Sequence, residues 1–165
     1  MNADISIKKI KRRGFGIVEI LVAAAIIGLG LTGLAAVGNF ALRAQANLKK
    51  SLMATNLASE AMEATKSLKD GGWSNISALT IDAPYHPAQS GSPLKWSLVA
   101  GEETTNEFSR KIILSQVQRD ANDDIAESGG IIDPNTRKIT VTVFWNERGR
   151  AYETILTSYI ADWKP

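Results

Sequence analysis

The sequence contains no cysteine and only one histidine. Without cysteine the chain can form no disulfide, no cysteine-based zinc site and no thiol nucleophile. One imidazole excludes a multi-histidine metal centre, whereas counting alone does not exclude a triad of serine, histidine and aspartate. His86 stands between Pro84 and Pro87 in a stretch typical of a loop, so we expect it to be solvated. No cluster of histidine, serine and carboxylate side chains converges in the sequence, so we expect a protein that is not an enzyme and has no cofactor.

Charge is missing from one long stretch near the N-terminus. The 23 residues from Ile20 to Leu42 carry no charge, and Thr32 and Asn39 are their only clearly polar members. A run of that length can cross the hydrocarbon core of a bilayer as one helix. Residues from 43 onward carry most of the charge and most of the aromatic side chains. The sequence predicts one membrane span followed by one modest exported domain.

Basic residues are concentrated just before this span. The formal net charge is only +2, so the chain beyond the basic cluster is net negative and offers no basic surface for nucleic acid. Positive charge beside an apolar run marks its cytoplasmic side. We therefore expect a cytoplasmic N-terminus and a C-terminal domain outside. The cluster, which is opposed only by Asp4, consists of Lys8, Lys9, Lys11, Arg12 and Arg13.

The junction between the cluster and the span differs from an ordinary secretory signal. Such a signal places its cleavage site after an apolar core of about 7 to 15 residues, whereas here Gly14 comes before the apolar run. Glu19 adds a carboxylate at the mouth of the membrane helix, where a charge is costly and usually marks a function or a partner. The alternative is that Glu19 reaches the lipid headgroups and has no further role.

The segment KKIKRRG followed by FGIVEILVAAAIIG resembles the leader and first helical turns of type IV pilins and type II secretion pseudopilins. In that family a prepilin peptidase cuts after the glycine, here Gly14, and N-methylates the new first residue, here Phe15. The fifth mature residue is a glutamate, here Glu19. The resemblance covers residues 8–42. It implies an α+β fold in which a long N-terminal α-helix packs against a C-terminal antiparallel β-sheet, and it implies no cofactor.

The resemblance also implies a structural role. Many major pilins have a proline near the position of Val22, and its absence here favours a minor pilin. The expected partners are other pilin subunits, the prepilin peptidase, the inner-membrane assembly platform and, before assembly, membrane lipid. The protein would lie in the cytoplasmic membrane and then in a surface filament or periplasmic pseudopilus. The alternatives are a type II secretion or DNA-uptake pseudopilin, or an uncleaved single-span protein that binds or senses a ligand.

These expectations divide the chain into a leader at 1–14, a membrane and filament-core segment at 15–42 and a head at 43–165. Cleavage after Gly14 would release a cationic amine on Phe15, four residues from Glu19. In a packed helical core, the Glu19 carboxylate of one subunit could pair with the amine of a neighbour. A lone buried carboxylate would be costly there, so the pairing would favour one axial register between subunits.

From Arg43 to Asp70 the pattern stays helical but becomes amphipathic, and Gly71-Gly72 ends it. We expect the face containing Leu48, Leu52, Leu57, Ala61 and Leu68 to pack on the sheet. Residues 73–91 contain Pro84 and Pro87, with Pro93 just beyond, and are expected to form a connecting loop. Alternating apolar residues predict strands at Lys95–Val99, Arg110–Gln118, Lys138–Trp145 and Tyr152–Ile160.

Two turns carry specific expectations. Residues 146–150 should form a hairpin turn in which Gly149 takes a positive φ. The acidic stretch Asp120–Asp133 offers oxygen donors at the first, third and fifth positions of a calcium loop. However, Ile125 and Ile131 stand where an EF-hand needs glycine and glutamate, which excludes that motif. We expect a solvated acidic turn, and a looser calcium site stays open.

Overall fold

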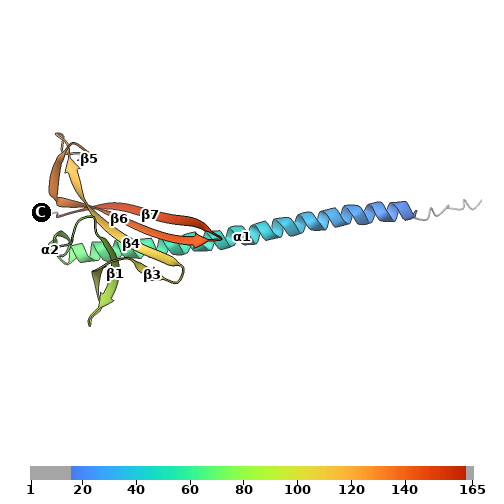
Figure 1. The fold of residues 1–165 in the computed structure, drawn as a ribbon, viewed down its shortest axis with the longest axis horizontal. Helices are drawn as coiled ribbons and strands as arrows, with labels where there is room; N and C mark the ends of the chain where they lie inside the picture. Colours follow the sequence, from blue (N-terminus) through green and yellow to red (C-terminus); the bar gives the residue numbers. More distant parts are fainter. Residues whose placement is uncertain (1–15, 163–165) are drawn as a thin grey trace, which may run out of the picture. The chain divides into compact units, whose positions relative to one another are not determined.

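The computed structural model describes residues 16–162, so the positions of Gly14 and Phe15 lie outside the described part. The chain divides into two compact units, Met1–Ala46 and Asn47–Pro165. The elements, of which all but β2 are labelled in Figure 1, follow one another as α1 (Ile17–Asp70), α2 (Ser74–Ser77), β1 (Pro84–Ser90), β2 (Lys95–Ala100), β3 (Glu103–Thr105), β4 (Phe108–Arg119), β5 (Ile125–Ala126), β6 (Ile131–Glu147) and β7 (Arg150–Ala161).

Helix α1 runs for 54 residues and contributes to both units. No proline interrupts it, and it ends where the sequence predicts. The Gly71 N–H donates to the Ser67 carbonyl at 3.1 Å, and the Gly72 N–H donates to the Lys69 carbonyl at 2.9 Å. Gly72 has a φ of 138°, which a residue with a Cβ rarely adopts, so a glycine is needed at this helix end.

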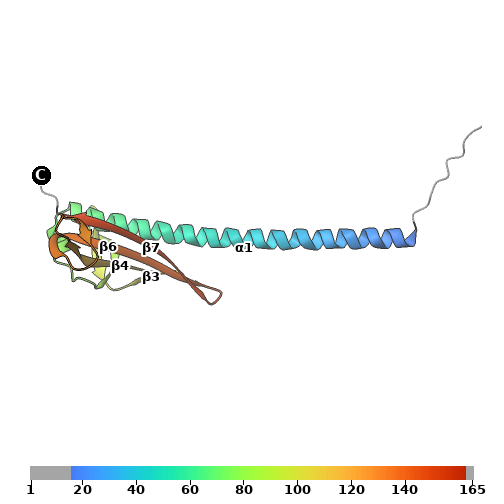
Figure 2. The same ribbon diagram turned by 90° about the horizontal axis from the view of Figure 1, so that it is seen from above.

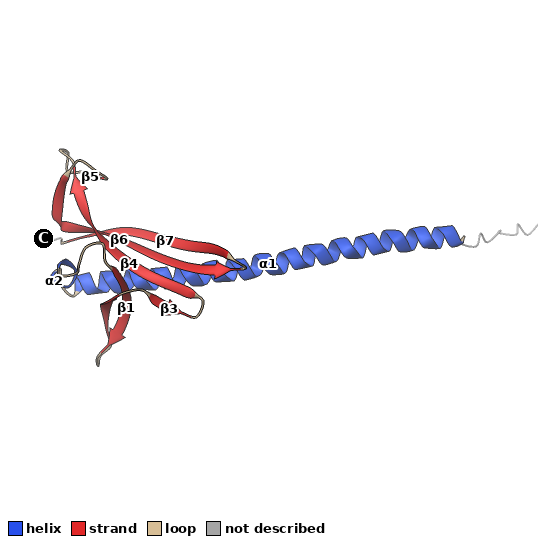
Figure 3. Ribbon diagram, in the orientation of Figure 1, coloured by secondary structure: helices blue, strands red, loops and turns tan. Residues whose placement is uncertain are grey.

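The strands form one antiparallel sheet in the order β2-β1-β4-β6-β7, with β3 and β5 also paired to β4. Figure 3 shows these strands in red beside the blue helices. The long strands β6 and β7 are joined by the predicted hairpin turn, in which Arg148 (φ 50°) and Gly149 (φ 77°) both have positive φ. A helix followed by an antiparallel sheet confirms the predicted α+β class.

The sheet covers one side of the C-terminal part of α1 as a single layer (Figure 2). The inner sheet face carries the alternating residues that the sequence predicts on β6, and Ile139, Val141 and Val143 are fully buried. Opposite them, α1 presents Ala54 and Ala58, which are also fully buried. Small alanine side chains let the helix approach the sheet closely, and the branched residues of the strands fill the space between them.

The expected leucine face of α1 is wrong in part. Leu48 and Leu52 are each 64% exposed, whereas Ala61 is buried, and Leu57 and Leu68 pack only at the edge of the core. The buried face instead follows the alanine positions, which lie on an adjacent side of the helix. Leucine spacing therefore predicted Leu48 and Leu52 wrongly, because packing on the sheet requires side chains small enough for close approach as well as hydrophobic ones.

The expected loop at residues 73–91 is also wrong, because this stretch contains α2 and strand β1. His86 therefore lies on a strand and is half-buried. Strand β1 pairs with β4 only at Pro84 and Tyr85, while its other side pairs with β2 as far as Ser90. Beyond Tyr85 one side of β1 has no strand partner among residues 16–162, and a sheet tolerates a proline such as Pro87 at an unpaired side.

Candidate functional site

Glu19 is the one predicted site residue that the structure describes, and it lies in the first turn of α1. The Gly16 carbonyl accepts the N–H groups of Glu19 at 3.0 Å and Ile20 at 3.2 Å, so the helix is formed from this point. The Glu19 side chain is exposed, and within residues 16–162 its carboxylate makes no hydrogen bond or ion pair. A carboxylate in the first turn is favourably placed toward the positive end of the helix dipole.

The residues around Glu19 are apolar and exposed. An 18-residue window of α1 has a mean hydropathy of 2.5, and none of it is buried within the chain. By length and composition this is a helix that could cross a membrane. Exposed apolar surface of this extent marks a site of contact with lipid or with another protein. Glu19 is thus a carboxylate at the start of a surface that needs a nonaqueous environment.

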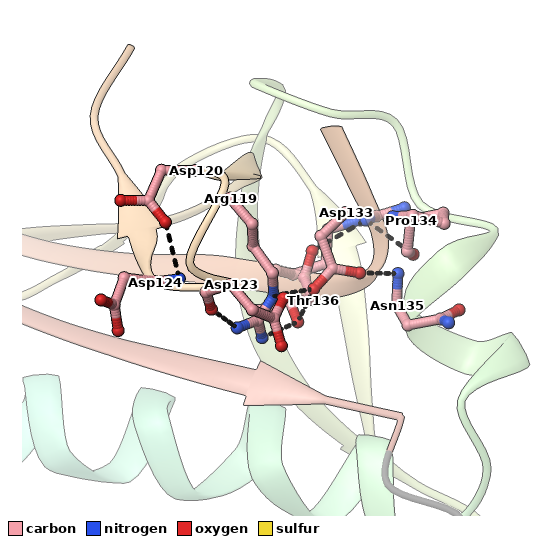
Figure 4. A network of polar contacts seen from close by, with 9 residues as sticks. Arg119, Asp120, Asp123, Asp124, Asp133, Pro134, Asn135 and Thr136 are labelled. Atoms are coloured by element: carbon pink, nitrogen blue, oxygen red, sulfur yellow. Dashed lines mark hydrogen bonds and ion pairs between the residues drawn. The ribbon is translucent and has the colours of Figure 1, made fainter. Parts of the chain in front are cut away.

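A second polar site lies where strand β4 ends, at the acidic stretch 120–133 (Figure 4). Arg119 at the end of β4 donates from Nε to Asp133 Oδ2 at 2.7 Å, and from Nη1 to the Asp123 carbonyl at 2.7 Å. Thr136 Oγ1 donates to the same Asp133 oxygen at 2.6 Å. A register shift between β4 and β6 at Gln116 and Val117 brings these ends of the two strands into this arrangement.

The guanidinium of Arg119, helped by the Thr136 hydroxyl, lowers the pKa of Asp133 to about 2. Asp120 turns inward on its own loop, where its Oδ1 accepts the N–H groups of Asn122 at 2.8 Å and Asp124 at 3.0 Å. Among residues 16–162, no group of three or more histidine, aspartate or glutamate side chains is placed to hold a metal ion. Arg119 supplies positive charge to the Asp133 carboxylate and, at 3.6 Å, to the Asp123 carboxylate.

Sequence reasoning missed a buried arginine at the centre of the sheet. Arg110 of β4 is only 5% exposed, and it donates from Nη1 to the Leu57 carbonyl of α1 at 2.9 Å. The guanidinium also pairs with the carboxylates of Glu60 on α1, at 3.5 Å, and Glu103 on β3. Phe108 and Ile112, two residues away on either side, are buried on the same face. The period-2 pattern could therefore have identified a charge pointing inward.

His86 makes one contact through its ring, between Nδ1 and the Gly101 carbonyl at 3.2 Å. No serine hydroxyl or carboxylate hydrogen-bonds to the imidazole within the described residues. This arrangement gives the histidine a role in holding the β1–β2 hairpin rather than in a triad.

Residues 9–35 match the family model described as the prokaryotic N-terminal methylation motif. That motif is the signature of type IV pilins and pseudopilins, which confirms the resemblance seen in the leader and first helical turns. No curated protein and no solved structure matches the chain. Motif and apolar N-terminal helix together indicate a type IV pilin-like or pseudopilin protein, and the motif points to a structural subunit rather than an enzyme.

Proposed function

We propose that this chain is a minor subunit of a type IV pilus-like filament. The observation that carries the proposal is a methylation motif that extends into an apolar helix, where the Glu19 carboxylate has no partner among residues 16–162. The head at 43–165 would be exported, and the basic leader at 1–14 would stay in the cytoplasm. Other pilin subunits, the prepilin peptidase and an inner-membrane assembly platform are the partners that this role requires.

The proposed sequence of events begins with cleavage after Gly14 and methylation of the amine of Phe15. Before assembly, the apolar part of α1 is covered by membrane lipid. On assembly it leaves the lipid and packs among the same segments of neighbouring subunits. The Glu19 carboxylate then faces a neighbour's cationic amine. The favoured axial register between subunits is therefore the one in which both charges are paired.

Intact-mass measurement on protein from cells with a prepilin peptidase tests this function. We expect a chain that begins at Phe15 and carries one N-terminal methyl group. Gly14→Ala should largely block the cut, and Gly14→Val should block it further, while Gly16→Ala serves as a matched control because it lies outside the cleaved bond. A mature chain that still begins at Met1, or is cut after the span, would refute the proposal.

A further inference from the structure

A cavity lies on the face of the sheet that is turned away from α1. Successive strand residues point to opposite faces, and the buried Ile139 and Ile160 belong to the core shared with the helix. Their neighbours Lys138 and Tyr159 therefore point to the other face, where they stand directly opposite each other on β6 and β7. Ser115 of β4 stands opposite Lys138 on its other side. These three residues form one row across neighbouring strands and line a cavity of about 410 Å³.

The turn that carries β5 forms another wall of this cavity through Ile125 and Glu127. Strand β5 pairs with the end of β4 at Gln118 and Arg119 (Figure 1). The Gly130 N–H donates to Gln118 Oε1 at 3.1 Å, and a Cβ at Gly130 would overlap the Arg119 carbonyl, so the turn packs closely on β4. The wall is therefore fixed by the fold, and the volume lies within the range of pockets that hold small molecules.

The polar side chains of this cavity have no partners of their own. Lys138 and Thr140 are half-buried. An ammonium only donates hydrogen bonds and a carboxylate only accepts them, whereas hydroxyl and amide groups do both. The cavity thus gathers unused donors and acceptors, which a ligand rich in hydroxyl groups would satisfy. Among residues 16–162, no hydrogen bond or ion pair is made by the side chains of Gln116, Glu127, Lys138, Thr140 and Tyr159.

Charge and aromatic surface narrow the class of ligand. Lys138 and Glu127 are the one cation and the one carboxylate among the lining residues, so the lining has no net charge. A strongly charged ligand would bring a like charge close to one of them. Tyr159 is 44% exposed and Ile125 is 46% exposed, which adds apolar surface to the polar groups. A sugar ring has the matching chemistry, with hydroxyl groups around its edge and apolar C–H groups on its faces.

We propose that this cavity binds a neutral sugar residue. The ring of Tyr159 contacts a C–H face of the sugar, Lys138 donates to a sugar hydroxyl, and Glu127 accepts from another. Thr140 and Gln116 supply the hydrogen bonds that either donate or accept. This assignment gives the head a ligand and thereby goes beyond the proposed filament role.

Saturation-transfer NMR on the full-length chain, solubilised in a detergent without a sugar headgroup, tests the proposal. The probes are the methyl glycosides of glucose, galactose and mannose, each compared with the methyl glycoside of the matching uronic acid. We expect at least one neutral glycoside to bind, and its uronic acid to bind more weakly because the cavity offers no net positive charge. Binding by none of the neutral glycosides, or stronger binding by an acidic one, would overturn the proposal.

Variants of the outer sheet face locate the binding. Thr140→Val should weaken binding of the neutral glycoside by about tenfold, because a sugar hydroxyl loses its partner. Thr142→Val is the matched control, since Thr142 lies on the same face of β6 but outside the cavity. Tyr159→Leu should weaken binding by a similar factor, whereas Tyr159→Phe keeps the ring and should retain most of it. Equal losses from Thr140→Val and Thr142→Val, or from Tyr159→Phe and Tyr159→Leu, would overturn the assigned site.

This measurement depends on neither N-terminal processing nor filament yield. A wild-type chain that stays unprocessed but binds a neutral sugar would refute the filament function alone. Conversely, a processed chain that forms filaments and binds no neutral sugar would refute the sugar site alone.

Discussion

At the residue scale, two arginines of β4 connect parts of the chain that are far apart in sequence. Arg110 joins the sheet to α1 through the Leu57 carbonyl and the Glu60 carboxylate. Arg119 joins the end of β4 to the start of β6 through Asp133. Both contacts use a guanidinium because its planar fork can serve several acceptors at once. We expect each contact to make a separate, measurable contribution to stability.

Arg110→Ala should destabilise the folded head by about 3 kcal/mol, because it removes a buried charge and leaves its acceptors without a donor. Arg110→Lys should restore little of this loss, since one ammonium cannot reach all three acceptors. Lys111→Ala is the matched control, because its partner Glu102 lies at the surface and such pairs contribute less than about 1 kcal/mol. Urea unfolding of the detergent-solubilised chain measures all three, and equal losses for Arg110→Ala and Lys111→Ala would contradict the assigned role.

Asp133→Asn should remove a pH-dependent contribution to stability. The pKa of Asp133 is about 2 in the folded chain against 3.8 as its ordinary value. Because the folded value is the lower one, the contribution is present above about pH 4 and is lost as the pH falls toward about 2. After allowance for solvent screening we expect a loss of about 1 kcal/mol at neutral pH. Unfolding midpoints between pH 2 and 7 should converge for wild type and variant at the acidic end, whereas Glu127→Gln should follow wild type throughout.

At the scale of elements, the contact between α1 and the sheet depends on alanines. Ala58 is fully buried between the helix and the strands, so Ala58→Leu should cost about 1 to 3 kcal/mol through overpacking. Leu52→Ala is the control, and because Leu52 is exposed it should change the free energy of unfolding by less than about 0.5 kcal/mol. Denaturant unfolding compares the two variants. A larger loss for Leu52→Ala would mean that the leucine face packs on the sheet after all.

The elements also show what the sequence could and could not predict. The alternation of apolar and polar residues predicted β6. Its inward-facing residues are large and branched, and its outward-facing residues include threonines. A sheet with one face on the core and the other in water produces this pattern directly. Hydrophobic periodicity did not predict which side of α1 is buried: Ala58 lies in the core and Leu52 does not. The distance between helix and sheet depends on the side chains of both, and the sequence of the helix alone does not give it. Strand β1 was not predicted because prolines usually argue against a strand. Here they are tolerated because each lies where β1 pairs on one side only. Arg119 and Asp133 escaped because their ion pair is made by strand register, which local sequence does not contain.

At the scale of the whole molecule, the residues that form the folded core and those that form the exposed apolar surface lie in different parts of the chain. Residues 47–165 contain the core that holds the sheet on α1, and residues 17–42 contain the exposed apolar surface. The apolar window of α1 is not buried within the chain, so we expect the core of the head to form without it. Under the proposed function, this segment would therefore pass from lipid to a filament core without unfolding the head. This separation makes it meaningful to test assembly by a change that leaves both the fold and the membrane span intact.

Glu19→Gln is that change. It keeps the size and helical preference of the side chain while removing the charge, so membrane insertion and cleavage after Gly14 should be preserved, and insertion should if anything improve. Assembly should fall, because the Phe15 amine of the neighbouring subunit is left without a counter-charge in a desolvated core. The readout is the ratio of sheared filament material to mature protein retained in the membrane. Glu19→Asp, which keeps the charge on a shorter side chain, should recover part of the loss. If Glu19→Gln leaves this ratio unchanged, the carboxylate has no part in assembly and only reaches toward the headgroups at the membrane surface.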